Sequence, residues 1–340
     1  MPKEDFIYGQ SKVEDFWKFI NDRHAIYLKR KAGELKPWSD DPIFQEWKFT
    51  NVFRELDHGT IALRRMLKQL YEKYTANKQY LLEKNKNTNN KREIQSRGVY
   101  VQGMEKNYIR NQFITCILYR MFNWHENAKF GPIDNSTAWY KYLINKLNNG
   151  DQITGGVCPY DNQRECTLES YIEVCREIVS DADDLINYIQ GNNKLEDAWV
   201  GLQEYDYIGP FIAYEFVCDL RYTDILRNAT DTCTWCNIGP GAERGLQRMG
   251  LKVDLESIQK LYVQSKDLLA VKPDCWGLLK EKSFKFQSPY NENHWIFNHL
   301  GRGQYPYWEL REIEHCLCEF DKYERIRLGQ GVPKVKFSGV

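Results

Sequence analysis

The sequence predicts a mainly α-helical fold. Apolar residues recur at the 3.6-residue period of an amphipathic helix in several segments, and long runs of β-strand formers are missing. No repeat period relates one part of the chain to another. With 340 residues, of which 42% are hydrophobic and 14% aromatic, the chain can form one large two-lobed domain with a substantial core, or two ordinary domains.

The N-terminal part predicts two helices followed by a loop. Residues 11–30 keep close to the helical period. A second helix is expected from Pro42, because Asp41 is a good N-cap and proline fits the first helical position. At about 83–98 the sequence becomes rich in Asn and Lys and loses its period, which indicates an exposed, flexible insertion. Its charge could attract DNA phosphates, but we favour a plain insertion.

Helical periodicity returns in the rest of the chain, with recognisable start and stop signals. Thr167 and Asp254 are suitable N-caps, and Gly191 with the two asparagines after it ends a helix. An aromatic, loop-like stretch with room for a short strand precedes the last helix. The helices expected from this pattern span 108–122, 137–148, 167–190, 254–270 and about 308–327.

Charge and hydropathy limit the classes of partner. Lys+Arg and Asp+Glu are both 47, so any surface that binds nucleic acid must be a local patch. No apolar run approaches the ~20 residues that a membrane span needs, and the N-terminus lacks the apolar core of a signal peptide. We therefore expect a cytosolic or nuclear protein without a membrane partner.

The ten cysteines are scattered. One CxxC pair, Cys233 and Cys236, has no second pair or histidine at zinc-finger spacing, and the four-cysteine spacing of an iron–sulfur cluster is absent. In a reducing compartment most of these thiols should be small buried hydrophobes.

The segment 195–246 has the pattern of a helix-hairpin-helix. A short helix, a tight turn at Ile208 and Gly209, and a second apolar helix follow one another. A glycine turn before a helix leaves backbone N–H groups free, and these groups with the positive end of the helix dipole can hold a phosphate. Asp224 lies just beyond the second helix, where it either acts in chemistry or caps a helix.

A second glycine turn, at Gly239 and Gly241, opens another expected helix that carries Arg244. The segment thus offers two anion-binding turns with a carboxylate between them.

The order of hairpin, helix and aspartate resembles the helix-hairpin-helix superfamily of DNA glycosylases. Three blocks carry a closer resemblance. They are DRHAIYLKRKAGELKPWSDDPIFQEWKFTNVFRELD, then IGPFIAYEF with TD and GPGAERGL, and EHCLCEFDKYERIRLGQG. Together they resemble the alpha-glutamyl/putrescinyl thymine pyrophosphorylase family of DNA base-hypermodifying enzymes. The resemblance implies a single two-lobed helical domain over 1–340 with a helix-hairpin-helix DNA glycosylase-like fold.

The resemblance also implies a reaction. Its substrate is DNA in which a 5-hydroxymethyluracil has been activated as the pyrophosphate by a separate upstream kinase, and an amino acid, polyamine or similar nucleophile displaces the pyrophosphate. Such a transfer needs cations for the leaving group, a base for the nucleophile and an aromatic pocket for the extruded base.

Candidate residues exist for each role. The acid–base candidates are Asp224, Asp231 and His315. The candidates for binding pyrophosphate are Arg23, His24, Lys29, Arg30, Arg54, Arg244, Lys322 and Arg325. The candidates for base stacking are Trp38, Trp235 and Tyr323, and those for the DNA backbone are Ile208, Gly209, Gly239 and Gly241.

No motif fixes a metal site. Mg²⁺ held against the pyrophosphate by acidic residues such as Asp41 or Asp321 stays a hypothesis, and no other cofactor is indicated.

The hairpin departs from the glycosylase pattern at two points. Tyr207 stands where the first glycine would be, and the second helix has no lysine for Schiff-base chemistry. This disfavours a lyase and leaves transfer or hydrolysis. The alternatives are a monofunctional DNA glycosylase that excises a modified pyrimidine, and a non-catalytic DNA-binding module. The resemblance suggests a bacteriophage protein in the cytoplasm of its host, although an AT-rich cellular genome, with nuclear localisation in a eukaryote, would also fit.

Overall fold

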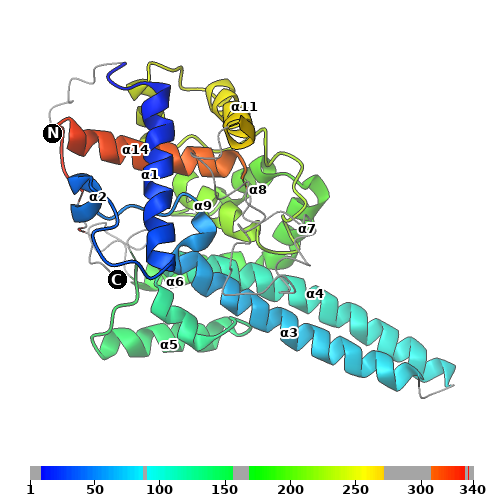
Figure 1. The fold of residues 1–340 in the computed structure, drawn as a ribbon. Coiled ribbons are helices and arrows are strands. Elements are labelled where there is room, and N and C mark those ends of the chain that lie inside the picture. The colour runs from blue at the N-terminus through cyan, green and yellow to red at the C-terminus, as the bar shows by residue number, and fades with distance from the viewer. Residues whose placement is uncertain (1–8, 87–89, 156–167, 272–307, 334–335, 337–340) are drawn as a thin grey trace. The chain divides into compact units, whose positions relative to one another are not determined.

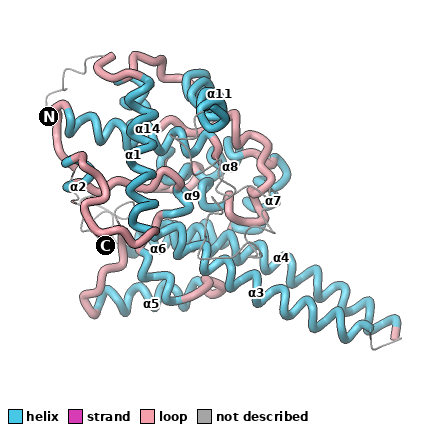
Figure 2. The backbone as a smooth tube through the Cα atoms, in the orientation of Figure 1, coloured by secondary structure: helices cyan, strands magenta, loops and turns pink. Residues whose placement is uncertain are grey.

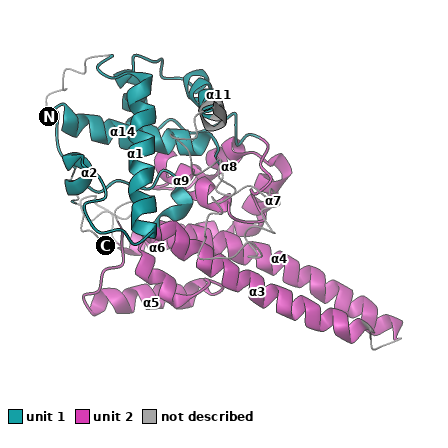
Figure 3. Ribbon diagram, in the orientation of Figure 1, with its two compact units in different colours: residues 1–57, 231–340 teal, residues 58–230 magenta. Residues whose placement is uncertain are grey.

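The computed structural model describes residues 9–86, 90–155, 168–271, 308–333 and 336. The described residues are mainly helical, as predicted, and their only β-pairing is a single bridge between Trp47 and Lys336 (Figure 1, Figure 2). The chain forms two compact units (Figure 3). Unit 1 contains 1–57 and 231–340, and unit 2 contains 58–230, so both ends of the chain build one unit.

In unit 1 the last helix packs against most of the others. Helix α14 contacts α10 most extensively, and also α11, α1 and α2. The elements of unit 1 are α1 (Val13–Lys31), α2 (Pro42–Glu46), the 3₁₀ turn η1 (Arg54–Leu56), α10 (Pro240–Arg248), α11 (Leu255–Val271) and α14 (Leu310–Arg327).

Unit 2 is built on a long pair of antiparallel helices, α3 and α4, to which the shorter helices are added (Figure 3). Its elements are α3 (His58–Lys86), α4 (Lys91–Phe122), the 3₁₀ helix η2 (His125–Phe130), α5 (Ser136–Asn148), α6 (Leu168–Ser180), α7 (Ala182–Asn192), α8 (Leu195–Leu202) and α9 (Pro210–Leu220).

Several predicted caps are confirmed. Asp41 accepts a hydrogen bond from the Ile43 amide at 2.8 Å, and Asp254 accepts one from the Ser257 amide at 2.8 Å. Asn193 ends α7 in the left-handed conformation, with φ +53°. Thr167 and the aromatic stretch 272–307 lie outside the described residues.

The helix expected from Pro42 is shorter than its sequence suggested. Helix α2 has five residues, and Trp47 after it is extended. The buried Arg23 donates to the carbonyls of Phe49 and Thr50, at 3.0 and 2.9 Å, so these carbonyls are held in an extended segment and cannot continue a helix.

The prediction of a loop at 83–98 was wrong. Residues 83–86 continue α3 and 91–98 begin α4, while 87–89 lie outside the described residues. Asn90 caps α4 by accepting from the Arg92 amide at 3.1 Å. Over this stretch most side chains are exposed and Arg97 donates to Asn85 at 3.2 Å, so the sequence shows no regular apolar stripe.

The single helix predicted over 167–190 is two helices, α6 and α7, separated at Asp181. The apolar period continues across the break because Cys175, Ile178, Ala182 and Ile186 are all buried. Periodicity alone could not show the break.

Helices α8 and α9 form the expected hairpin within unit 2. Tyr207, at the position of the first glycine, adopts φ +61°, a left-handed conformation that favours glycine. Its ring lies 5.5 Å from that of Tyr171. Ile208 is buried, and Gly209 is the exposed N-cap of α9. The turn thus keeps a positive φ without a glycine.

Two glycines let α10 pack closely on α14. A Cβ at Gly241 would lie 2.8 Å from the Cys318 sulfur, and one at Gly245 would lie 2.5 Å from the Leu317 carbonyl oxygen. Gly241 therefore serves helix packing, which explains this glycine without a contact to DNA.

Gly245→Ala should destabilise the protein by about 1–3 kcal/mol, because the added methyl meets the fixed backbone of α14. Urea unfolding gives the comparison. The matched control is Gly98→Ala in α4, where a Cβ meets nothing within 4 Å and should stabilise the helix by about 0.5–1 kcal/mol. Equal stability of Gly245→Ala and the wild type would contradict the close packing.

Candidate functional site

Helix α14 carries an unusual set of buried charged side chains. Charged residues are rarely buried without partners, because desolvation is costly. The buried charged residues of α14 are Arg311, Glu312, Glu314, Asp321 and Glu324. Their partners come from the residue before α1, from η1, from α10 and its N-cap, and from α14 itself.

Asp321 stands at the centre of an arginine cluster. Arg248, which is buried, donates to its Oδ1 at 2.8 Å, and Arg244 donates to its Oδ2 at 2.9 Å. The Arg325 Nε lies 3.5 Å from the same Oδ2. The side chains of Arg244 and Arg325 are 41% and 33% exposed. Three guanidinium groups thus share one carboxylate, which leaves an excess of positive charge at the surface.

Glu314 occupies the start of α10. The Gly239 amide, at the N-cap of α10, donates to the Glu314 Oε1 at 3.3 Å. His315 lies beside the same carboxylate, with Nε2 3.7 Å from Oε2. The predicted anion-binding turn at Gly239 therefore holds an anion of the protein itself, which corrects its assignment to the DNA backbone.

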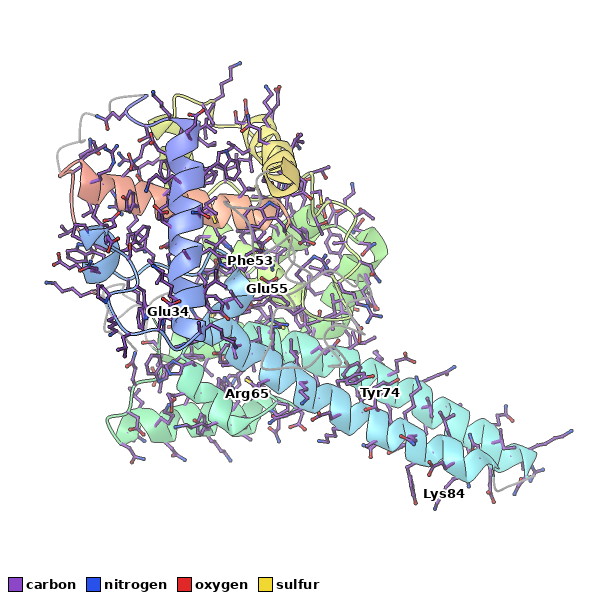
Figure 4. The ribbon with its side chains drawn as sticks, viewed as in Figure 1. Glu34, Phe53, Glu55, Arg65, Tyr74 and Lys84 are labelled. Carbon is purple, nitrogen blue, oxygen red and sulfur yellow. The ribbon has the colours of Figure 1, made fainter. Side chains whose placement is uncertain are left out.

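A buried ion cluster lies at the start of α14. Arg311 donates to Glu312 at 2.8 Å and to Glu55 of η1 at 2.9 Å. Burial raises the pKa of Glu312 to about 8, and this effect outweighs the opposing effect of Arg311. Figure 4 labels Glu55 and the neighbouring Phe53, whose ring lies 5.5 Å from that of Trp308.

The N-terminal block supports α14 rather than presenting a row of free cations. Arg23 is buried and binds carbonyls of the 49–50 segment. His24 is buried, and desolvation with the nearby Arg23 lowers its pKa to about 3. A neutral imidazole cannot supply charge to a pyrophosphate, so neither residue keeps its predicted role.

The other cations of this region differ in exposure. Arg54 pairs with Asp57 at 2.7 Å, and Lys322 pairs with Glu319 at 2.6 Å. Glu319 also accepts from the Thr50 amide at 3.0 Å. Lys29 is exposed on α1.

The predicted stacking residues lie in different environments. Tyr323 is half-buried; its ring packs among Phe19, Phe44 and Phe49, and its hydroxyl donates to Asp41 at 2.6 Å. Trp235 is buried.

Trp38 is partly exposed. Arg30 and Lys36 each lie 5.2 Å from the centre of its ring. Of the three predicted rings, Trp38 and Tyr323 are thus partly accessible, and Trp38 also has two cations beside it.

The two candidate aspartates belong to different units. Asp224, in unit 2, pairs with Arg227 at 2.5 Å. Burial raises the pKa of the Tyr108 phenol, and the nearby Asp224 carboxylate raises it further. Asp231, in unit 1, begins a turn in which its carbonyl accepts from the amides of Thr234 and Trp235 at 2.9 Å.

Sequence reasoning missed a second buried ion cluster, in unit 2. Arg120 on α4 donates to both oxygens of Asp219 at 2.6 Å and to Glu215 at 2.9 Å. Two acids four residues apart in an otherwise apolar helix were the available signal, because such a pair needs a buried cation.

Within the part of the chain that the structure describes, no group of acidic, cysteine or histidine side chains is arranged to hold a metal ion. No described helix is long and apolar enough to cross a membrane.

Comparison with known proteins decides the family. A family model described as "5-hmdU DNA kinase, helical domain" matches residues 10–79 and 60–332. The chain belongs to this family. The matched residues include all the contacts of Asp321 described above.

A curated relative, the 5-hmdU DNA kinase of Bacillus phage SP10, is 25% identical over 268 residues. The aligned part is 70% of this chain and 36% of the relative, so the chain spans much less than the relative's full length. No solved structure matches the chain. Neither match names a pyrophosphorylase, so the transfer reaction stays a proposal.

Asp321→Asn should destabilise unit 1 by about 3–5 kcal/mol, because it leaves the buried Arg248 without its charged partner. Chemical denaturation measures the change. Glu256→Gln is the control, since it removes an exposed pair with Lys260 and should cost under about 1 kcal/mol. Equal losses of unfolding free energy in the two variants would show that the arginine cluster on Asp321 does not stabilise the fold.

Glu312 should make stability depend on pH. Its pKa is raised in the folded state, so the folded protein binds more protons than the unfolded chain between the ordinary glutamate pKa and about 8. Stability from this group therefore falls as pH rises through that window. Glu312→Gln should flatten the pH dependence measured by unfolding at several pH values, and an unchanged profile would reject the assignment.

Proposed function

We propose that this protein takes part in the hypermodification of thymine in DNA, as a transferase that replaces the pyrophosphate of an activated 5-hydroxymethyluracil with an amine. The family match supports a role with 5-hydroxymethyluracil DNA. The observation that carries the proposal is the arginine cluster on Asp321, where the partly exposed Arg244 and Arg325 can receive a polyanionic leaving group.

The geometry of the cluster suits a leaving group. Arg248 and Asp321 are both 1% exposed, and together they fix the guanidinium groups of Arg244 and Arg325 through one carboxylate. Preorganised cations stabilise charge that develops in a transition state without having to rearrange. Arg248 is held in turn by Gln330, which accepts from it at 2.9 Å.

The proposed transfer has a simple balance. The bond between the 5-methylene carbon and the pyrophosphate oxygen breaks, and the oxygen keeps the electron pair. A bond forms between the carbon and the nitrogen of an amino acid or polyamine, and this nitrogen gives one proton to a base. Asp224, Asp231 and His315 are the candidate bases. Mg²⁺ bound with the pyrophosphate remains part of the hypothesis.

DNA contacts are assigned to two surfaces. In unit 2, the exposed Gly209 at the N-terminus of α9 is placed to meet a phosphate, with Ile208 anchoring the turn. In unit 1, Trp38 with Arg30 and Lys36 offers a ring and two cations to a base or phosphate. The upstream partner is a 5-hydroxymethyluracil DNA kinase, and the phage relative favours the cytoplasm of an infected bacterium.

A second candidate function is a domain that holds DNA for a kinase. The observation that favours it is that the match covers a helical domain and 36% of a longer kinase. The 340 residues contain no GxxxxGK[ST] phosphate-binding sequence. A holding domain would bind the DNA but form no adduct.

One assay separates the two candidates. Duplex DNA that carries 5-(pyrophosphoryloxymethyl)uracil is incubated with the protein and amines such as glycine, glutamate or putrescine. A transferase yields a nucleoside of increased mass and one released pyrophosphate for each adduct. DNA binding without an adduct or pyrophosphate supports the holding domain, and free base with abasic sites indicates a glycosylase.

Arg244→Ala and Arg325→Ala should each lower kcat of the transfer by about 10²-fold, because each removes a cation aimed at the leaving group. Released pyrophosphate is the readout. Arg176→Ala, which removes an exposed arginine of unit 2 paired with Glu173, is the control and should leave kcat unchanged. Full activity in both cluster variants would reject the assignment.

A further inference from the structure

The distal parts of α3 and α4 form an arm. We define the arm as residues 76–86 and 90–104, which run side by side and extend from the rest of unit 2 (Figure 1, Figure 3). At its base the rings of Tyr74 and Tyr108 stack at 4.5 Å, and further out Arg97 donates to Asn85 at 3.2 Å. Figure 4 shows Lys84 far out on the arm from Tyr74.

The arm is basic although the whole chain is neutral. The chain has a formal net charge of zero. Residues 76–85 and 90–104 of the arm carry two acidic side chains, Glu83 and Glu93, and a larger number of cationic ones. These cations are Lys78, Lys84, Lys91, Arg92 and Arg97. Positive charge is therefore concentrated on one projecting element, which produces a local field for a polyanion.

Exposed aromatic and aliphatic side chains accompany these charges. Tyr80, Val99 and Tyr100 are 55%, 66% and 62% exposed. The Lys84 ammonium lies 5.0 Å from the centre of the Tyr80 ring, so charge and ring occupy one face of α3. Rings exposed among cations are typical of nucleic-acid surfaces, because they can lie against sugars and bases beside the phosphates.

Two glycines in α4 indicate that the arm is not optimised for internal stability. A Cβ at Gly98 or Gly103 would meet nothing within 4 Å, so neither glycine is needed for packing. Each costs the helix roughly 0.5–1 kcal/mol relative to alanine. Both lie on the stretch of α4 that carries the exposed Val99 and Tyr100.

We propose that this arm binds the phosphate backbone of duplex DNA. A second copy of the arm would bring like charges together, whereas phosphates complement them. The proposal rests on the proposed function only in taking the polyanion to be DNA. It adds a binding surface separate from the hairpin turn at Gly209 and from the arginine cluster on Asp321.

Charge reversal on the arm tests the proposal. The variant Lys84→Glu with Lys91→Glu changes one exposed residue on each helix. In fluorescence anisotropy with a duplex containing 5-hydroxymethyluracil, its affinity should fall at least about tenfold at moderate salt. The slope of log K against log salt should become shallower by about two, since each lost phosphate contact contributes about 0.9.

A matched variant controls for the change in the net charge of the protein. Lys129→Glu with Lys141→Glu reverses two exposed lysines of unit 2 outside the arm and should keep wild-type affinity and slope. The variant Tyr80→Ser with Tyr100→Ser should weaken DNA binding several-fold without changing the salt slope. It tests the same surface independently in case the charge-reversal variant does not fold. Circular dichroism confirms helix content in each case.

The outcomes decide the proposal separately from the transfer reaction. Wild-type binding by the arm variant, or equal losses in both lysine variants, overturns it. So does a change from dimer to monomer in the arm variant without a change in DNA affinity, which would make the arm a contact between subunits. A chain that forms no adduct yet loses DNA affinity only through the arm variants sustains the arm and rejects the transferase.

Discussion

The pairing of buried charges on α14 is the constraint on which unit 1 depends. A carboxylate in the interior must find hydrogen-bond donors or a cation, and three of those on α14 find them in other segments of unit 1. Glu324 accepts from Ser11, which precedes α1, and from Arg327. Glu314 accepts from the start of α10, and Asp321 binds its arginines. The register of α14 against α1 and α10 is therefore set by ionic pairing as well as by apolar contact.

Buried ion pairs seldom stabilise a core more than apolar residues of similar volume would. Their concentration on one helix therefore fits a second use. In the Asp321 cluster the buried pair with Arg248 stays inside, while Arg244 and Arg325 extend to the surface. The same carboxylate thus supports the fold and aims two cations outward.

The sequence predicted helices best where local signals are strong. The caps at Asp41 and Asp254 and the stop at Asn193 depend on neighbouring residues only, and all three are confirmed. The arm was mistaken for a loop because two paired helices that expose most of their surface carry no apolar stripe. The break between α6 and α7 was hidden because both helices bury the same kind of side chain.

The site was predictable in outline but not in detail. The blocks that carry Arg244 and Arg325 were singled out from sequence, and the structure brings these two residues onto one carboxylate. Ion pairs such as Glu55 with Arg311 join residues 256 positions apart, and no local pattern reveals them. The sequence also does not show which side chains are buried. His24 and Arg23 were therefore predicted to bind pyrophosphate, although both are buried.

The discontinuity of unit 1 has a consequence for biosynthesis. Residues 1–57 leave the ribosome well before α14, the helix whose Arg311 pairs with their buried Glu55 and which begins only at Leu310. Until then Phe16 and Glu55 lack their α14 partners Phe320 and Arg311, while 58–230 can already collapse on itself. Translation therefore favours folding of 58–230 first, and unit 1 can complete its core only after α14 has been made.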